Sequence, residues 1–154
     1  MEIDIRNPRL DEYGAAEHIM EQVHQMHIGW RPDIYKQSKP VLPFEMYRQA
    51  VETGTFFVAE YGGEIAGILL IFFKHIESPN HAPRKIIFVD AMAVDEKYRG
   101  KGIGHAFFGF LKKIKEQKGY DGIELQVNAK NTAAYQFYSN YGFTEQSINM
   151  ELLP

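Results

Sequence analysis

The sequence predicts a fold of the α/β class, with strands and amphipathic helices interleaved along one domain. Segments of alternating or continuously apolar residues, typical of strands, are interleaved with segments whose apolar residues recur at helical spacing. The length of 154 residues is ordinary for one domain. No repeat, low-complexity tract or linker divides the chain, so residues 1–154 are expected to form a single domain.

The composition excludes several classes of protein. The chain is 45% hydrophobic and 24% charged, which indicates a soluble globular protein. Its net charge of −3 does not favour nucleic acid as a partner. Without cysteine it has no disulfide, thiol nucleophile or cysteine metal ligand. It has no signal pattern, and its longest apolar run, Ile65 to Phe73, is too short to cross a bilayer, so a cytoplasmic protein with no membrane segment is expected.

The first half of the chain predicts a strand, two helices and two further strands. Ile3 and Ile5 alternate with polar residues, and apolar residues then recur twice at helical spacing. Gly62 and Gly63 predict a tight hairpin turn. The predicted segments are a strand over 2–6, helices over 11–27 and 44–52, and strands over 55–60 and 65–73.

The second half predicts a strand, a helix, a strand, a helix and a final strand. A polar loop with two prolines, 78–83, precedes it. Gly119 and Gly142 are suited to end the two helices, and Asn131 is suited to cap the second one. The predicted segments are strands over 86–94, 123–127 and 143–152 and helices over 103–118 and 131–141. The complete order is β-α-α-β-β-β-α-β-α-β.

The junction between the strand over 86–94 and the next helix has the composition of a phosphate-binding turn. The first N–H groups of a helix have no partner inside it and lie at the positive end of its dipole. Glycines let a ligand approach those groups, and two cations lie beside them here. The alternative is a glycine-rich helix entry without a ligand, and Ile103 is expected to be mainly a core anchor. The six residues are Arg99, Gly100, Lys101, Gly102, Ile103 and Gly104.

Two common phosphate loops do not fit this junction. The chain has no GxxxxGK followed by Ser or Thr, and the third glycine position of a dinucleotide-binding GxGxxG motif is His105. A nucleotide-binding βαβ protein is therefore disfavoured. The pattern present is Arg99-x-x-Gly102-x-Gly104, which resembles the coenzyme A loop of the GCN5-related N-acetyltransferases, the GNAT superfamily.

A second signature extends the resemblance toward the C-terminus. It follows the loop at the distance usual in this superfamily and reads Asn131-x-x-Ala134-x-x-Phe137-Tyr138-x-x-x-Gly142-Phe143. The resemblance implies a mixed, mostly antiparallel central sheet of six to seven strands flanked by about four helices. It also implies that the helices before the second strand wall the acceptor site, where His24, His27, Trp30, Tyr35 and Tyr47 are candidates.

The resemblance implies roles for the cofactor-binding residues. The pyrophosphate of acetyl-CoA is expected on the N–H groups of Arg99 to Gly104. The pantetheine arm is expected along the backbone of Met92, Ala93 and Val94, where the fourth and fifth strands splay apart and an N–H group can stabilise an oxyanion.

Two further positions carry a choice of roles. Tyr138 matches the tyrosine that protonates the departing thiolate; the alternative is a core aromatic. Asn131 matches a residue that contacts the cofactor; the alternative is a plain helix cap.

Asp90 is the candidate general base, since an alkyl amine must lose a proton before it attacks a thioester. It is the only charge in an apolar strand, and alternation places it on the face of Met92 and Val94. Burial of an unpaired carboxylate is unfavourable, so Asp90 calls for a partner or a role. The alternative is a structural residue that accepts hydrogen bonds from a neighbouring loop.

The resemblance implies an acetyl-CoA-dependent N-acetyltransferase. It would act on a primary amine of a small molecule or peptide by direct transfer in a ternary complex, because no cysteine can carry an acetyl group. No motif among the six histidines predicts a metal site. The alternatives are a non-catalytic acyl-CoA-binding sensor or interaction module, and an N-acyltransferase that uses a longer acyl-CoA. Members of the superfamily are often dimers, so a homodimer is one expected assembly, although no pattern fixes it.

Overall fold

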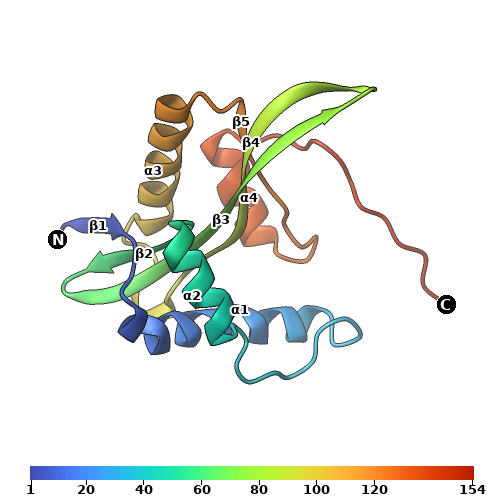
Figure 1. Ribbon diagram of the computed structural model, residues 1–154. Coiled ribbons are helices and arrows are strands. Elements are labelled where there is room, and N and C mark those ends of the chain that lie inside the picture. Colours follow the sequence, from blue (N-terminus) through green and yellow to red (C-terminus); the bar gives the residue numbers. More distant parts are fainter.

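A computed structural model describes residues 1–154 and contains five strands and four α-helices (Figure 1). Two short 3-10 turns, η1 (Leu10–Glu12) and η2 (Glu96–Tyr98), precede the helices α1 and α3. The strands are β1 (Ile3–Arg6), β2 (Phe56–Tyr61), β3 (Glu64–Ser78), β4 (His81–Val94) and β5 (Gly122–Leu125). The helices are α1 (Tyr13–Trp30), α2 (Phe44–Thr53), α3 (Ile103–Lys118) and α4 (Thr132–Tyr141).

The strands form one mixed sheet in the order β1-β2-β3-β4-β5. Every neighbouring pair is antiparallel except β4 and β5, which are parallel. A parallel pair needs a crossover, and α3 supplies it. The predicted α/β class and mostly antiparallel sheet are confirmed.

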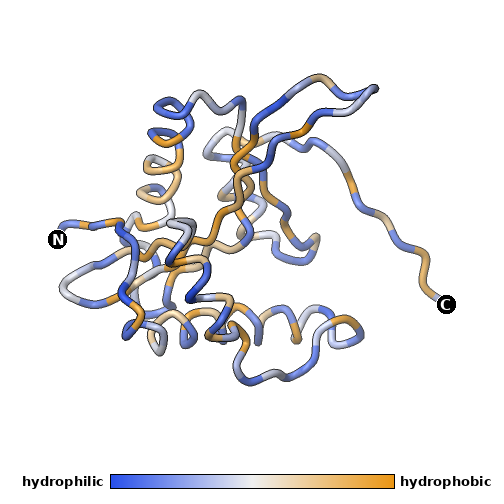
Figure 2. Tube along the Cα trace, viewed as in Figure 1, coloured by the Kyte–Doolittle hydropathy of each residue, from blue (hydrophilic) through white to orange (hydrophobic).

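Each face of the sheet buries its own hydrophobic cluster. Phe107, Phe108 and Leu111 of α3 pack on one face of the sheet, whereas Ile19 of α1 and Tyr47 of α2 pack on the other. Figure 2 shows the hydrophobic residues concentrated along the central strands and the inner sides of the helices. Because helices cover both faces of the sheet, the end of β4 is held in a fixed position relative to the start of α3.

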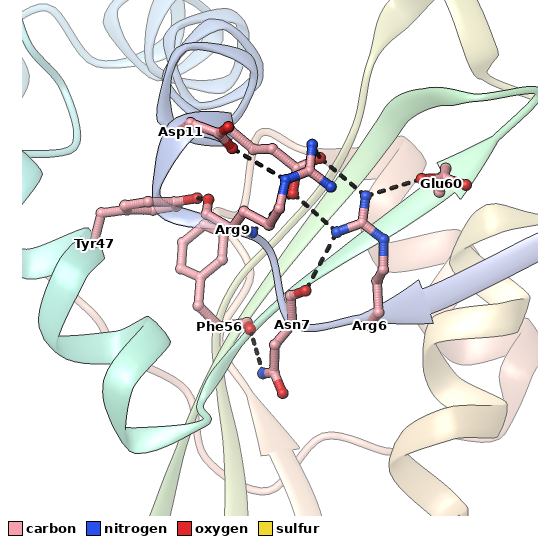
Figure 3. Close-up of polar contacts among 8 residues, drawn as sticks. Arg6, Asn7, Arg9, Asp11, Tyr47, Phe56 and Glu60 are labelled. Carbon is pink, nitrogen blue, oxygen red and sulfur yellow. Dashed lines mark hydrogen bonds and ion pairs between the residues drawn. The ribbon is translucent and has the colours of Figure 1, made fainter.

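A polar network secures the N-terminal strand to the body of the protein (Figure 3). The guanidinium of Arg6 donates hydrogen bonds of 2.9 Å to the carboxylates of Glu12 and Glu60. The hydrogen bond from Arg6 lowers the pKa of Glu12 to about 2, although partial burial opposes the shift. Asn7 donates to the carbonyl of Phe56, so the turn after β1 is tied directly to β2.

Two predictions about strands are wrong. The sheet has five strands rather than six to seven, because residues 143–152 form no strand: apart from the N–H of Phe143, which donates to the carbonyl of Tyr138, they make no backbone hydrogen bond. The predicted polar loop 78–83 is instead the tip of a hairpin, since β3 continues to Ser78 and β4 begins at His81. This arm projects from the body in Figure 1, so its strands carry polar residues and lack the apolar pattern on which the prediction depended.

Candidate coenzyme-binding site

The predicted strand, glycine-rich turn and helix are confirmed between β4 and α3. Gly100 and Gly102 have φ values of 77° and 85°, a conformation that L side chains rarely adopt. A Cβ atom at either position would meet no atom within 4 Å, so open space lies beside this turn. Arg99 and Lys101 are both exposed next to it.

The turn presents a row of free hydrogen-bond donors. None of the backbone N–H groups from Gly100 to His105 donates a hydrogen bond within the protein. The first backbone bond of α3 runs from the N–H of Ala106 to the carbonyl of Gly102, over 3.0 Å. The N-cap residue Gly102 has no side chain to cap the helix. An arrangement of this kind suits a phosphate-bearing ligand.

Two glycines allow the helix to lie close to its neighbours. A Cβ atom on Gly104 would be 2.8 Å from Cζ of Phe137, so α3 and α4 can approach only because this residue is glycine. A Cβ atom on Gly67 of β3 would be 3.0 Å from Phe107 and 3.1 Å from Ile103. Sequence reasoning missed Gly67, although a glycine inside an apolar strand is itself a signal of close approach.

A buried carboxylate joins the turn to α1. Asp95 is 6% exposed and accepts hydrogen bonds from the N–H of Lys97 and from the side chain of Gln22. Gln22 also accepts a hydrogen bond of 3.1 Å from the N–H of Glu96. A shallow hollow lies beside this link, between α1 and the turn. Its lining residues are Gln22, Gln25, Met26, Glu96 and Arg99.

The end of β4 has one free edge. β5 pairs with β4 only from Ile86 to Val89, whereas Met92, Ala93 and Val94 pair with β3 alone. The predicted separation of these two strands is therefore confirmed. The free edge leads directly to the glycine-rich turn and offers unpaired backbone groups to an extended ligand.

Asp90 lies in a β-bulge that sequence alternation did not reveal. Leu70 pairs with Ala91 and the next residue, Ile71, pairs with Val89, which leaves Asp90 as the extra residue of β4. The side chains of Val89 and Met92 accordingly pack in the same cluster under α3. The prediction that Asp90 shares a face with Met92 and Val94 is therefore wrong, because a bulge reverses the alternation.

The carboxylate of Asp90 is exposed rather than buried. Nearby protein atoms still displace part of its water, and this desolvation raises its pKa, while the positive charge of Lys74 opposes the shift. The ammonium of Lys74 lies 3.8 Å above the ring of Phe88. Asp90 has no hydrogen-bonded partner in the protein, so it remains free to accept a proton from a ligand.

Tyr138 combines an aromatic environment with a free hydroxyl. Its ring lies 5.9 Å from those of Phe108 and Phe143. Burial raises the pKa of Tyr138, and no protein group forms a hydrogen bond with its hydroxyl, which is not fully buried. The residue is thus both a packing aromatic and an available proton donor.

Asn131 is the N-cap of α4. Its side-chain oxygen accepts a hydrogen bond of 3.1 Å from the N–H of Ala134. The capping interpretation is confirmed, and the side-chain nitrogen keeps its donors for another contact. The neighbouring Lys130 donates to the carbonyl of Trp30, which ties the start of α4 to the end of α1.

The candidate acceptor-wall residues are only partly brought together. The ring of Tyr35 stacks on His27 with a centroid distance of 5.0 Å, and His24 lies edge-on to the same tyrosine. Burial, and to a smaller extent the charge of His24, lower the pKa of His27. Trp30 lies 5.7 Å from His27. Tyr47 instead is fully buried in the core, where its hydroxyl donates to a backbone carbonyl.

No group of three His, Asp or Glu side chains converges to hold a metal ion. No helix is both long and apolar enough to cross a membrane. The groups left without a partner at this end of the sheet are the N–H groups of the turn, the edge of β4 beyond Val89 and the side chains of Asp90 and Tyr138.

Comparison with known proteins identifies the family. The sequence model of the Acetyltransferase (GNAT) family matches residues 20–143. An N-acetyltransferase of Methanocaldococcus jannaschii is 26% identical over 144 residues, which cover 94% of this chain and 62% of that protein. An N-alpha-acetyltransferase of Sulfurisphaera tokodaii is 32% identical over 98 residues, covering 60% of this chain and 58% of its own.

The crystal structure of a tetramutant of the BH1408 protein from Bacillus halodurans has the same fold. It superimposes with a TM-score of 0.92 at 28% identity and covers 98% of this chain and 99% of its own.

The chain therefore belongs to the GNAT acetyltransferase family, and the predicted resemblance is confirmed. The chain spans about three fifths of the length of these two relatives, so the activity of each full-length relative is stated of that relative alone.

Proposed function

We propose that this protein transfers an acetyl group from acetyl-CoA to a primary amine of a small molecule or peptide. Membership of the GNAT acetyltransferase family supports acetyl transfer in general. The use of acetyl-CoA and of a primary amine as acceptor is what we propose. The observation that carries it is the row of free N–H groups from Gly100 to His105 beside the open edge of β4. A pyrophosphate is recognised by such donors, and an amide-containing pantetheine arm suits a free strand edge.

Acetyl-CoA supplies an activated acetyl thioester when bound. In the proposed reaction the amine nitrogen forms a bond to the acetyl carbonyl carbon and the carbon–sulfur bond breaks. Asp90 takes the proton that the amine loses, directly or through a water molecule, and Tyr138 gives a proton to the departing thiolate. Backbone N–H groups between Met92 and Val94 stabilise the negative charge on the carbonyl oxygen.

The coenzyme contacts are proposed for Arg99, Gly100, Lys101, Gly102 and Gly104 through the phosphates, and for Asn131 through its free amide donors. Ile103 is 2% exposed and anchors α3 in the core, so only its backbone is proposed to contact the ligand. The acceptor is proposed to enter between the end of α1 and Asp90, along the aromatic group of His27 and Tyr35.

A thiol-release assay tests this function. The purified chain is incubated with acetyl-CoA and a panel of amines that includes alkyl amines, polyamines and peptides with free N-termini. Release of free coenzyme A with one amine class, together with the acetylated product by mass spectrometry, supports the proposal. Faster release from longer acyl-CoA esters would favour the longer-chain acyltransferase instead.

A matched pair of variants connects that activity to the turn. Arg99→Ala is expected to raise the KM for acetyl-CoA about tenfold, the loss of one charge-assisted contact to phosphate. Lys113→Ala removes an exposed cation about three turns into α3, away from the turn, and is expected to leave KM unchanged. Tight binding of acetyl-CoA without thiol release from any amine would contradict catalysis and favour the sensor.

A further inference from the structure

Two phenylalanine side chains are exposed in the middle of the sheet. Phe72 of β3 is 45% exposed, and Phe88, its direct partner on β4, is partly exposed. Neither ring belongs to the hydrophobic clusters that fill the two faces of the sheet. Adjacent exposed aromatic residues on two central strands are typical of a binding surface rather than of a core. We call Phe72 and Phe88 the phenylalanine platform.

The platform lies on the same face of the sheet as α1 and α2, just beyond the cover of these helices. The preceding pair of residues on this face, Leu70 and Ala91, still packs in the cluster of α1 and α2. Phe72 follows Leu70 by two residues, so it faces the same side, whereas the intervening Ile71 packs under α3. In Figure 1, β3 and β4 continue past α1 and α2 toward the projecting arm, which leaves the platform open.

A carboxylate and an ammonium group lie at the two ends of the platform. Asp90 follows Phe88 by two residues, about 7 Å along β4, and the intervening Val89 packs under α3, so Asp90 is on the platform's face. Lys74 follows Phe72 by two residues on β3, and its ammonium lies 3.8 Å from the centre of the Phe88 ring. Because the two strands are antiparallel, Asp90 lies toward the glycine-rich turn and Lys74 toward the arm.

A neighbouring pair of charges on this face is already neutralised. Glu124 of β5 lies beside Phe88, but its carboxylate forms an ion pair of 3.1 Å with Arg84. The charge of Lys74 opposes the desolvation that raises the pKa of Asp90, yet these two groups form no ion pair. A ligand on the platform therefore meets an apolar floor with a negative charge at one end and a positive charge at the other. Sites for small molecules commonly combine an apolar lining with a few polar groups in this way.

We propose that the acceptor is a primary monoamine with an aromatic body, an arylalkylamine, and that the phenylalanine platform selects it. The inference rests on the proposed acetyl transfer and names the substrate class of that reaction. The amine nitrogen lies at Asp90, where it loses its proton, and the aromatic ring rests on Phe72 and Phe88. A linker of about two to four carbon atoms spans the distance of about 7 Å between Asp90 and the platform. The ammonium of Lys74 attracts the ring by a cation–π interaction and repels a second ammonium group, so polyamines are disfavoured.

A comparison of three amines gives the first test. Initial rates of thiol release are measured with phenethylamine, n-propylamine and 1,5-diaminopentane at saturating acetyl-CoA. The value of kcat/KM for phenethylamine is expected to exceed that of each other amine at least about tenfold, as partial burial of one ring implies. Equal values for the three amines would overturn the substrate class and leave acetyl transfer intact, whereas no release with any amine would overturn both.

Replacement of Phe72 tests the platform itself. Phe72→Thr keeps a residue suited to a strand and is expected to lower the ratio of kcat/KM for phenethylamine over n-propylamine about tenfold. The Kd for phenethylamine, measured by calorimetry on the chain saturated with coenzyme A, is expected to rise by the same factor. Phe44→Thr is the matched control, since Phe44 is also 45% exposed but lies on α2, and it is expected to change neither quantity. Phe72→Leu keeps an apolar side chain without a ring and is expected to give an intermediate ratio.

Replacement of Lys74 tests the discrimination against diamines. Lys74→Glu offers a negative charge to the second ammonium group and is expected to raise kcat/KM for 1,5-diaminopentane relative to phenethylamine at least about tenfold. Lys85→Glu makes the same change of charge on the opposite face of β4 and is expected to leave this ratio unchanged. An unchanged ratio in Lys74→Glu or in Phe72→Thr would overturn the proposal. A lower molar mass of Phe72→Thr by light scattering, with its ratio unchanged, would identify the platform instead as an interface between copies of the chain.

Discussion

Replacement of Gly104 by alanine tests how the glycine-rich turn is held against α4. A Cβ atom at this position would lie 2.8 Å from Cζ of Phe137, closer than real Cβ contacts allow, and 3.2 Å from Cε2, which is tighter than most. The ring of Phe137 must therefore move or α3 must shift away from α4. Overpacking of this kind costs about 1–3 kcal/mol. Alanine also favours a helix over glycine by about 1 kcal/mol, so the net destabilisation is expected to be about 0–2 kcal/mol.

Gly109→Ala is the matched control in the same helix. A Cβ atom on Gly109 would meet nothing within 4 Å, so only the helix preference acts and the variant is expected to gain about 1 kcal/mol at most. The two variants should therefore differ by about 1–3 kcal/mol in the free energy of unfolding, a separation of roughly 2–12 °C in Tm for a chain of this size. Urea and thermal unfolding, followed by circular dichroism, measure both quantities.

The functional consequence is separable from the loss of stability. A shift of α3 away from α4 moves the free N–H groups of the turn, so Gly104→Ala is also expected to weaken acetyl-CoA binding at temperatures where the variant is fully folded. Phe137→Leu in the Gly104→Ala background removes ring atoms from the contact and is expected to recover part of the affinity. If Gly104→Ala and Gly109→Ala are equally stable, the close contact with Phe137 is refuted.

Three further predictions concern catalysis and pH. Tyr138→Phe is expected to lower kcat by about tenfold or more in steady-state kinetics. The Kd for acetyl-CoA, measured by calorimetry, is expected to stay within about twofold. A kcat equal to that of the unchanged protein would exclude the Tyr138 hydroxyl from proton transfer. A general base must be ionised, so activity is expected to fall as pH decreases through the raised pKa of Asp90. Asp90→Asn should remove this acidic limb from the pH profile of kcat/KM. An unchanged profile would leave Asp90 with a structural role. The folded pKa of Glu12, about 2, lies below its ordinary value of 4.5, so the stability from its pairing with Arg6 is present above pH 4.5 and is lost as pH falls toward 2. Glu12→Gln is expected to cost about 1–2 kcal/mol at pH 7 and much less at pH 2, because solvent screens part of the interaction, whereas the exposed Glu2→Gln should change little at either pH.

The features that were predictable from sequence are those set by local chemistry. Glycines at 100 and 102 give the chain the left-handed turn that begins α3, and Asn131 caps α4, because backbone conformation and capping depend on a few adjacent residues. The apolar runs likewise identified the central strands, since burial on both faces of a sheet leaves a continuous hydrophobic signal.

The features that were missed depend on segments distant in sequence. The bulge at Asp90 is a mismatch between β3 and β4, which neither strand shows alone, so period-two reasoning assigned the wrong face. The closeness of Gly104 to Phe137 requires two packed helices. Residues 143–152 were predicted as a final strand, but a strand forms only where another extended segment pairs with it, and no strand pairs with these residues.

Calorimetric titration of the purified chain with acetyl-CoA tests the central claim most directly, with ATP and NAD as controls. ATP and NAD share phosphate groups with the coenzyme but lack the pantetheine arm, so they separate general anion binding from use of the β4 edge. Acetyl-CoA is expected to bind at a ratio of one per chain, at least about tenfold more tightly than either nucleotide. Titration of ¹⁵N-labelled protein should then shift the amide signals of Gly100, Gly102 and Gly104. Absence of acetyl-CoA binding, or tighter binding of a nucleotide, would contradict the assignment of this turn to coenzyme A.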